Sequence, residues 1–251
     1  MNLVKSSVVV VVFVSLMAAI PAAQAACSNA SLNGVYGVLG TGLNGSSQLA
    51  SGVTRVSLDG AGNATGTTTK SIDGSIVTYT FTGTYTINAN CAGSATWTNQ
   101  SDQTEHDNIF LNEGNLGAYL IQTDPVHVQS GTAVALGSSI VCTDAGVKRR
   151  YSVQLTGSDI SIGQVALAGQ FTFNGTGTVS GNATLSLNGT ILNALPVTGT
   201  YVINSDCTGT AQITPRGQST INLYLLAVSN DKEILAVETD ANTIVAGTLQ
   251  Q

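Results

Sequence analysis

The sequence predicts an all-β protein made of two tandem antiparallel β-domains, each a small eight-stranded barrel. Three observations lead to this prediction. The pattern T-G-T-Y-x-I-N-x-[ND]-C-x-G occurs at residues 82–93 and again at residues 198–209, which indicates a duplication. Short segments rich in valine, isoleucine and threonine recur with turn residues between them, as in strands joined by hairpins. Beyond residue 25, no segment has the apolar spacing of an amphipathic helix.

Residues 1–25 have the pattern of a signal peptide. Lys5 supplies a positive charge, residues 8–20 are largely apolar, and Ala23-Gln24-Ala25 is a small-x-small cleavage site. We therefore expect cleavage near Ala25 and a secreted or periplasmic location. No later apolar run is long enough to cross a membrane as a helix, so no transmembrane helix is predicted.

The chain carries few charges. Charged residues make up 9% of it, and the formal net charge is −6. An acidic chain without a basic stripe argues against nucleic acid as a partner. No CxxC, HExxH or phosphate-binding glycine loop occurs, so the sequence predicts neither a cofactor nor a metal site.

The repeat divides the chain after the leader into two copies, residues 26–137 and residues 138–251. The short join at residues 137–141 is expected to be a tight linker or a strand that runs into the second copy. Outside the opening pattern, four pairs of segments align: 36–42 with 151–157, 58–66 with 173–181, 122–124 with 238–240, and 131–132 with 247–248.

The four cysteines fit the duplication. Each copy holds two, and Cys27 and Cys91 recur in the second copy as Cys142 and Cys207. Four cysteines allow three pairings, and a duplicated unit should reproduce its own bond. The repeat therefore predicts the disulfides Cys27–Cys91 and Cys142–Cys207, which also agree with an exported protein.

The strands of the first copy follow from the alternation of apolar and polar residues. Residues 53–58 alternate, and residues 59–63 (D-G-A-G-N) suit a hairpin turn. Residues 64–70 are polar and β-branched, which predicts an exposed or edge strand. Residues 77–88 form the longest predicted strand, and shorter strands follow at 91–97, 109–111, 118–122 and 132–136. The side chains expected toward the core of the two central strands are those of Tyr79, Phe81, Tyr85, Ile87, Cys91, Ala95 and Trp97.

Two architectures accommodate eight short strands in each copy. Consecutive hairpins favour an up-and-down barrel, and closure removes the edges that would otherwise expose strands with few charges. Two tandem β-sandwiches remain the alternative.

Parts of the repeat resemble a group of exported bacterial proteins, mostly uncharacterised. Their repeats read LNGtY, FDGxGNxtG and GtYtVnxdCtG, and the matching segments here are residues 31–36, 58–66 and 82–93. The second copy departs from the first block at residues 144–147. The Gly34-Val35-Tyr36 step is also similar to the Gly-x-Trp of lipocalin-like (calycin-like) barrels. These resemblances imply export and a barrel but no activity.

The densest polar cluster consists of Asp102, Glu105, His106 and Asp107. Carboxylates beside a histidine can hold a metal or act as an acid–base pair. The second copy has Gln218, Ile221, Asn222 and Leu223 at these positions, so the cluster is not part of the shared scaffold. An exposed loop between strands is the alternative interpretation, and it is the one that we favour.

The sequence leaves three hypotheses on function. The first is a non-catalytic binding or surface-interaction module with an unknown extracellular or cell-surface partner. The second is a carrier that holds a small apolar ligand inside a barrel. The third is an enzyme with a loop-borne site near His106, which we favour least. The carrier hypothesis names as ligand-lining residues Tyr79, Phe81, Tyr85, Trp97 and Tyr201.

Overall fold

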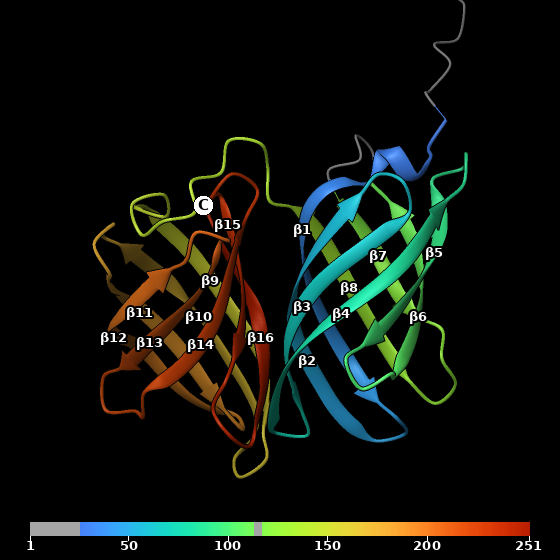
Figure 1. The fold of residues 1–251 in the computed structure, drawn as a ribbon. Helices are drawn as coiled ribbons and strands as arrows, with labels where there is room; N and C mark the ends of the chain where they lie inside the picture. The colour runs from blue at the N-terminus through green and yellow to red at the C-terminus, as the bar shows by residue number, and fades with distance from the viewer. Residues whose placement is uncertain (1–25, 113–116) are drawn as a thin grey trace, which may run out of the picture.

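The computed structural model describes residues 26–112 and 117–251, and it contains two closed barrels that stand side by side (Figure 1). Each barrel has eight antiparallel strands in up-and-down order. The predicted pair of eight-stranded barrels is therefore confirmed, and the alternative of two sandwiches is wrong. The predicted signal peptide, residues 1–25, lies outside the described residues.

The first barrel begins after a short 3-10 helix, η1 (Asn29–Ser31), and closes where β8 pairs with β1. Its register places Tyr36 opposite Val56 on one side and Ala135 on the other. The strands are β1 (Asn33–Asn44), β2 (Gln48–Asp59), β3 (Asn63–Ile72), β4 (Ser75–Ile87), β5 (Ala92–Asn99), β6 (Thr104–Leu111), β7 (Gly117–Gln122) and β8 (Val128–Ala135).

The second barrel repeats this order and closes where β16 pairs with β9. Its register places Leu155 opposite Leu167 and Gly247, just as Gly40 of the first barrel lies opposite Gly52 and Gly131. The strands are β9 (Arg150–Asp159), β10 (Gly163–Phe173), β11 (Thr178–Leu187), β12 (Thr190–Ile203), β13 (Thr208–Pro215), β14 (Ile221–Val228), β15 (Glu233–Glu238) and β16 (Thr243–Gln250).

The repeated pattern closes the same end of each barrel. Cys27 is bonded to Cys91, and Cys142 to Cys207, in the pairing that the repeat predicts. Each bond ties the segment before the first strand to the turn after the fourth strand of its barrel. A buried tyrosine completes each closure through its hydroxyl: Tyr85 Oη donates to the carbonyl oxygen of Leu32 at 2.7 Å, and Tyr201 Oη donates to that of Asp144 at 3.1 Å.

The third strand departs from its prediction. Residues 64–70 were expected to form an exposed or edge strand, but β3 is paired with β2 and β4. Thr68 faces the barrel interior, while Thr69 and Ser71 are buried on the outer wall, where Ser71 Oγ donates to the carbonyl oxygen of Thr243 in the second barrel. A polar, β-branched strand is buried here because a closed barrel has no edge and a second barrel covers this wall.

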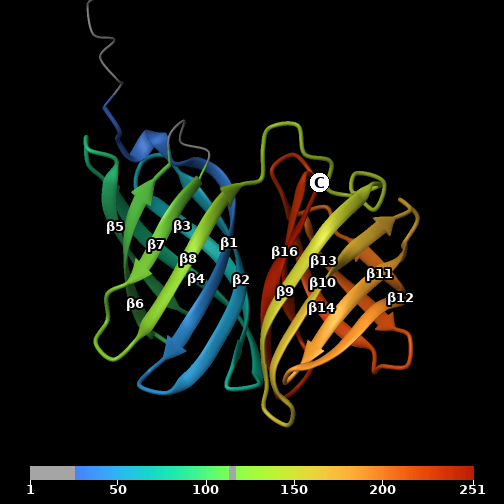
Figure 2. The same ribbon diagram turned by 180° about the vertical axis from the view of Figure 1, so that it is seen from behind.

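The two barrels share an apolar interface. Val53, on the outer wall of β2, is 0% exposed and belongs to the same core cluster as Leu226 and Leu235 of the second barrel. A Cβ added at Gly37 would lie within 3.0 Å of both leucine side chains, so this glycine permits the close approach. The join between the barrels, residues 136–149, forms turns, so the predicted alternative of a strand continuing into the second copy is wrong. It connects the barrels at the end where η1 lies (Figure 2).

Candidate functional site

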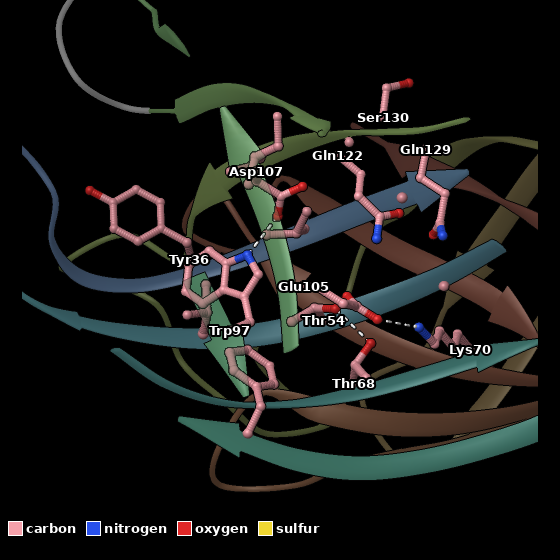
Figure 3. Close-up of a pocket in the computed structure, with 18 of the residues that line it drawn as sticks. Tyr36, Thr54, Thr68, Lys70, Trp97, Glu105, Asp107, Gln122, Gln129 and Ser130 are labelled. Carbon is pink, nitrogen blue, oxygen red and sulfur yellow. Dashed lines mark hydrogen bonds and ion pairs between the residues drawn. The ribbon is translucent and has the colours of Figure 1, made fainter. Parts of the chain in front are cut away.

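The interior of the first barrel contains a cavity of about 160 Å³, to which all eight strands contribute residues. It extends from Leu32 and Tyr36, beneath the closed end, to Asn99, Gln103 and Gln129 toward the other end. Figure 3 shows that its side chains are of two kinds, aromatic rings on one part of the wall and charged or amide groups on the other.

The aromatic part is built by alternate residues of neighbouring strands. Phe81 of β4 and Trp97 of β5 meet edge to face, with ring centroids 5.6 Å apart. Gly83 lies opposite Trp97 in the register, and an added Cβ would come within 2.7 Å of the indole ring. The glycine of the repeated T-G-T-Y pattern thus makes room for the only tryptophan of the chain.

An ion pair crosses the polar part of the cavity. Nζ of Lys70, on β3, lies 3.3 Å from Oε1 of Glu105, on β6, and 5.2 Å from the centre of the Tyr79 ring. Burial opposes the charge on Lys70, but Glu105 and Tyr79 together raise its pKa above the ordinary value. The ammonium group therefore stays protonated inside the barrel.

A second carboxyl group lies deeper in the same cavity. Oδ2 of Asp107 accepts a hydrogen bond from Nε1 of Trp97 at 2.5 Å (Figure 3). Burial raises the pKa of Asp107 to about 6, and the neighbouring carboxylates of Glu105 and Asp124 add to the rise, although the bond from Trp97 opposes it. Among the described residues, Asp107 forms no ion pair.

The second barrel has aliphatic residues at the equivalent interior positions. Its hollow, about 340 Å³, is lined mainly by aliphatic residues together with Glu238 and the loops at the end opposite its disulfide. The half near the disulfide is filled by fully buried Tyr151, Phe171 and Phe173. From the matching registers, the residues that replace Gly40, Gly52, Lys70, Glu105 and Asp107 of the first barrel are Leu155, Leu167, Leu185, Ile221 and Leu223.

Three of the five residues predicted to line a ligand cavity do so: Tyr79, Phe81 and Trp97. Tyr85 and Tyr201 do not, and that part of the prediction is wrong. Both tyrosines are buried at the closed end of their barrels, where their hydroxyls also accept hydrogen bonds from the amides of Gly60 and Gly175. The alternation showed correctly that they face inward, but it does not give their depth along the barrel.

The predicted polar cluster is divided between two faces of one strand. Glu105 and Asp107 point into the cavity, whereas His106 points outward, with Nδ1 2.7 Å from Oδ1 of Asp124. Asp102 is exposed in the turn between β5 and β6. The four residues therefore do not form one site, because successive side chains of a strand alternate. Within the described residues, no group of three or more His, Cys, Asp and Glu side chains could hold a metal ion.

Lys70 is the interior residue that sequence reasoning missed. It ends the segment 64–70, which was interpreted as an exposed or edge strand, so it was not assigned to the interior. The alignment of the two copies contains a signal that could have found it. Its equivalent, Leu185, is a core residue, and a charge at a core position of the duplicate marks an unusual interior.

No protein-family model matches the chain, and no curated protein matches it in sequence. The resemblance of its repeats to those of exported bacterial proteins therefore stays a prediction. Within the described residues, none of the helices is of a length and apolarity that could span a membrane.

Proposed function

We propose that the protein is exported and acts as a non-catalytic binding protein, which holds a small molecule inside the first barrel. The observation that carries this proposal is the contrast between the two copies at equivalent positions. Where the second barrel has Leu155, Leu185 and Leu223, the first has Gly40, Lys70 and Asp107 around a cavity. Since the same fold accepts aliphatic residues there, its stability does not require the polar ones.

The lining also changes the expected ligand. A wholly apolar molecule, as first predicted, would lie against the Lys70–Glu105 pair and would leave Oδ1 of Asp107 without a partner in a confined space, which is costly. A molecule with both an apolar body and a polar group would satisfy both parts of the wall. The two disulfides support the proposed secreted or periplasmic location, since such bonds persist in oxidising compartments.

Native mass spectrometry of the exported protein tests this proposal. The wild type is compared with Gly40→Leu, which introduces the side chain that the second barrel has at Leu155. A small molecule retained by the wild type and lost from the variant is the expected result. A bare mass for the wild type, with no change in Trp97 fluorescence on addition of small amphiphilic compounds, would end the proposal.

A second candidate function is self-association through the outer wall of β6 and β7. Phe110, Tyr119 and Ile121 are 48%, 59% and 49% exposed on that wall. Their equivalents in the second barrel, Leu226, Leu235 and Val237, are buried, and Leu226 and Leu235 lie against Gly37 of the first barrel. The same wall of the repeat unit thus serves as an interface in one copy and is uncovered in the other.

The partner that we propose for this wall is a second copy of the chain, related by a two-fold axis. In a head-to-tail contact, the wall of β6 and β7 would have to pack on a wall like that of β1 and β2. The corresponding wall of the second barrel, formed by β9 and β10, carries exposed polar or small residues, among them Ser152, Gln154 and Gln170. Sedimentation of wild type and Tyr119→Asp tests the idea. Dimers lost in the variant support it, and a wild type that stays monomeric at high concentration contradicts it.

A further inference from the structure

The cavity of the first barrel holds more carboxyl groups than cations. Among its described lining residues, Lys70 is the only cation, and Glu105 and Asp107 are the two carboxyl groups. Lys70 is already paired with Glu105 at 3.3 Å. Asp107 is therefore the group whose charge the protein itself does not balance.

Asp107 also has an unused acceptor. Its Oδ2 accepts the hydrogen bond from Trp97. Its Oδ1 accepts no hydrogen bond from the described residues, and this oxygen is accessible rather than fully buried. An ionised carboxylate with an open oxygen is a binding group for a donor that carries positive charge. The indole of Trp97 and the rings of Phe81 and Tyr79 lie on the same cavity, where aromatic faces attract cations and apolar groups alike.

From this geometry, and resting on the proposed function, we infer that the ligand of the first barrel is a small amphiphilic amine. Its ammonium group would lie against Oδ1 of Asp107, and its apolar body would pack on Trp97, Phe81 and Tyr79. An anionic ligand is disfavoured because Asp107 would repel it and Lys70 is already neutralised by Glu105. A neutral ligand would leave the partly buried carboxylate of Asp107 unbalanced.

The single tryptophan of the chain makes this inference testable, because Trp97 lies in the cavity and the second barrel has none. Trp97 fluorescence is followed while the mature protein is titrated with 2-phenylethylamine, 2-phenylethanol or 3-phenylpropionate, which share one apolar body. At pH 8 we expect the amine to bind about tenfold or more tightly than the alcohol, as expected for a charge-assisted bond, and the carboxylate to bind weakest.

The preference for the amine should also weaken below about pH 6, where Asp107 becomes protonated. Glu105 on the same strand, Lys70 on β3, and Asp124 and His106 nearby also act on this region, so the pH series is repeated with Asp107→Asn. That variant should bind the amine and the alcohol equally at every pH. The matched control is Asp102→Asn, in the exposed turn, which should behave like the wild type.

Each other outcome overturns the inference, and one of them would also contradict the proposed function. Equal affinity for the three probes means that the cavity binds small molecules without selecting amines. Tightest binding of 3-phenylpropionate makes Lys70 the anchoring group. If no probe alters Trp97 fluorescence, the amine assignment is wrong, and a bare native mass in addition would mean that the proposed function is wrong as well.

Discussion

The indole nitrogen of Trp97 lies 2.5 Å from Oδ2 of Asp107, inside the first barrel and between neighbouring strands. This bond holds the only tryptophan of the chain against a partly buried carboxyl group that no cation among the described residues balances. The equivalent positions in the second barrel are Ile213 and Leu223, which are both buried and apolar. The polar pair is therefore a feature of one copy and not a requirement of the fold.

Asp107→Asn should stabilise the protein at neutral pH. The pKa of this carboxyl group is about 6 in the folded state, whereas an ordinary aspartate, as in the unfolded chain, has a pKa near 3.8. Between these two pH values the folded state therefore binds more protons than the unfolded state. Wild-type stability attributable to Asp107 is therefore greatest below pH 4 and falls as the pH rises to 6. Above pH 6 the free energy of unfolding of the variant should exceed that of the wild type by about 3 kcal/mol.

Urea denaturation at pH 4 and pH 8 measures this effect. The two proteins should have similar stabilities at pH 4 and differ at pH 8. Asp102→Asn, which changes a carboxyl group exposed in a turn, provides the control and should shift stability little at either pH. If Asp107→Asn proves less stable than the wild type at pH 8, the ionised carboxylate stabilises the barrel and the prediction is wrong.

Gly40→Leu should reduce the cavity while preserving the fold. The backbone of Gly40 is not in the left-handed region, and a Cβ added there would meet only the carbonyl oxygen of Ser130, at 3.8 Å. The leucine would fill space that Leu155 fills in the second barrel. Burying its side chain should raise the free energy of unfolding by about 1 kcal/mol or leave it unchanged, within the range expected for aliphatic burial.

A Gly52→Leu variant is the contrasting case for this measurement. An added Cβ at Gly52 would lie 2.6 Å from Cβ of Lys70, so this substitution should be destabilising and should disturb the Lys70–Glu105 pair. Thermal unfolding compares the two variants with the wild type. Marked destabilisation by Gly40→Leu would mean that the cavity cannot accept an aliphatic side chain at that depth.

Val53→Asp should separate the unfolding of the two barrels. Val53 is 0% exposed in the interface, and a carboxylate there would be buried without a partner, which costs several kcal/mol. The matched variant is Ala168→Asp, at the equivalent but exposed position on β10, where the change should be within about 0.5 kcal/mol. Chemical denaturation should show one transition for the wild type and two for Val53→Asp. A single unshifted transition would mean that the barrels fold independently of this contact.

The fold was largely predictable, because the evidence for it is local and repeated. Alternation along residues 77–88 placed Tyr79 and Phe81 inside, and the recurrence of Cys91 as Cys207 gave both disulfide pairings. Closure into barrels followed from the lack of long connections between consecutive strands. These features depend on neighbours in sequence, so one chain was enough to infer them.

The site was less predictable, because it depends on which residues meet across the barrel. Lys70 and Glu105 are 35 residues apart, and neither sequence segment indicates the other. Reading Asp102, Glu105, His106 and Asp107 as one cluster ignored the alternation that was applied elsewhere. The difference between the copies at Lys70 and Leu185 was visible in the sequence, but its meaning needed the register.

The last prediction concerns the closed end of the first barrel. Replacing both Cys27 and Cys91 by alanine removes a bond that closes a loop with a sequence separation of 64 residues. In the chain-entropy model such a bond stabilises the folded state by about 4 kcal/mol, and the pair Cys142 and Cys207, with a separation of 65, should contribute about the same.

Because Leu32 and Tyr36 line the cavity beneath this end, loss of the first bond should also weaken ligand retention, whereas loss of the second should not. Denaturation of both double variants, together with native mass spectrometry, measures the two effects, and a thiol probe should find no free cysteine in the wild type before reduction. Equal loss of ligand in both variants would mean that retention follows overall stability and not the closed end of the first barrel.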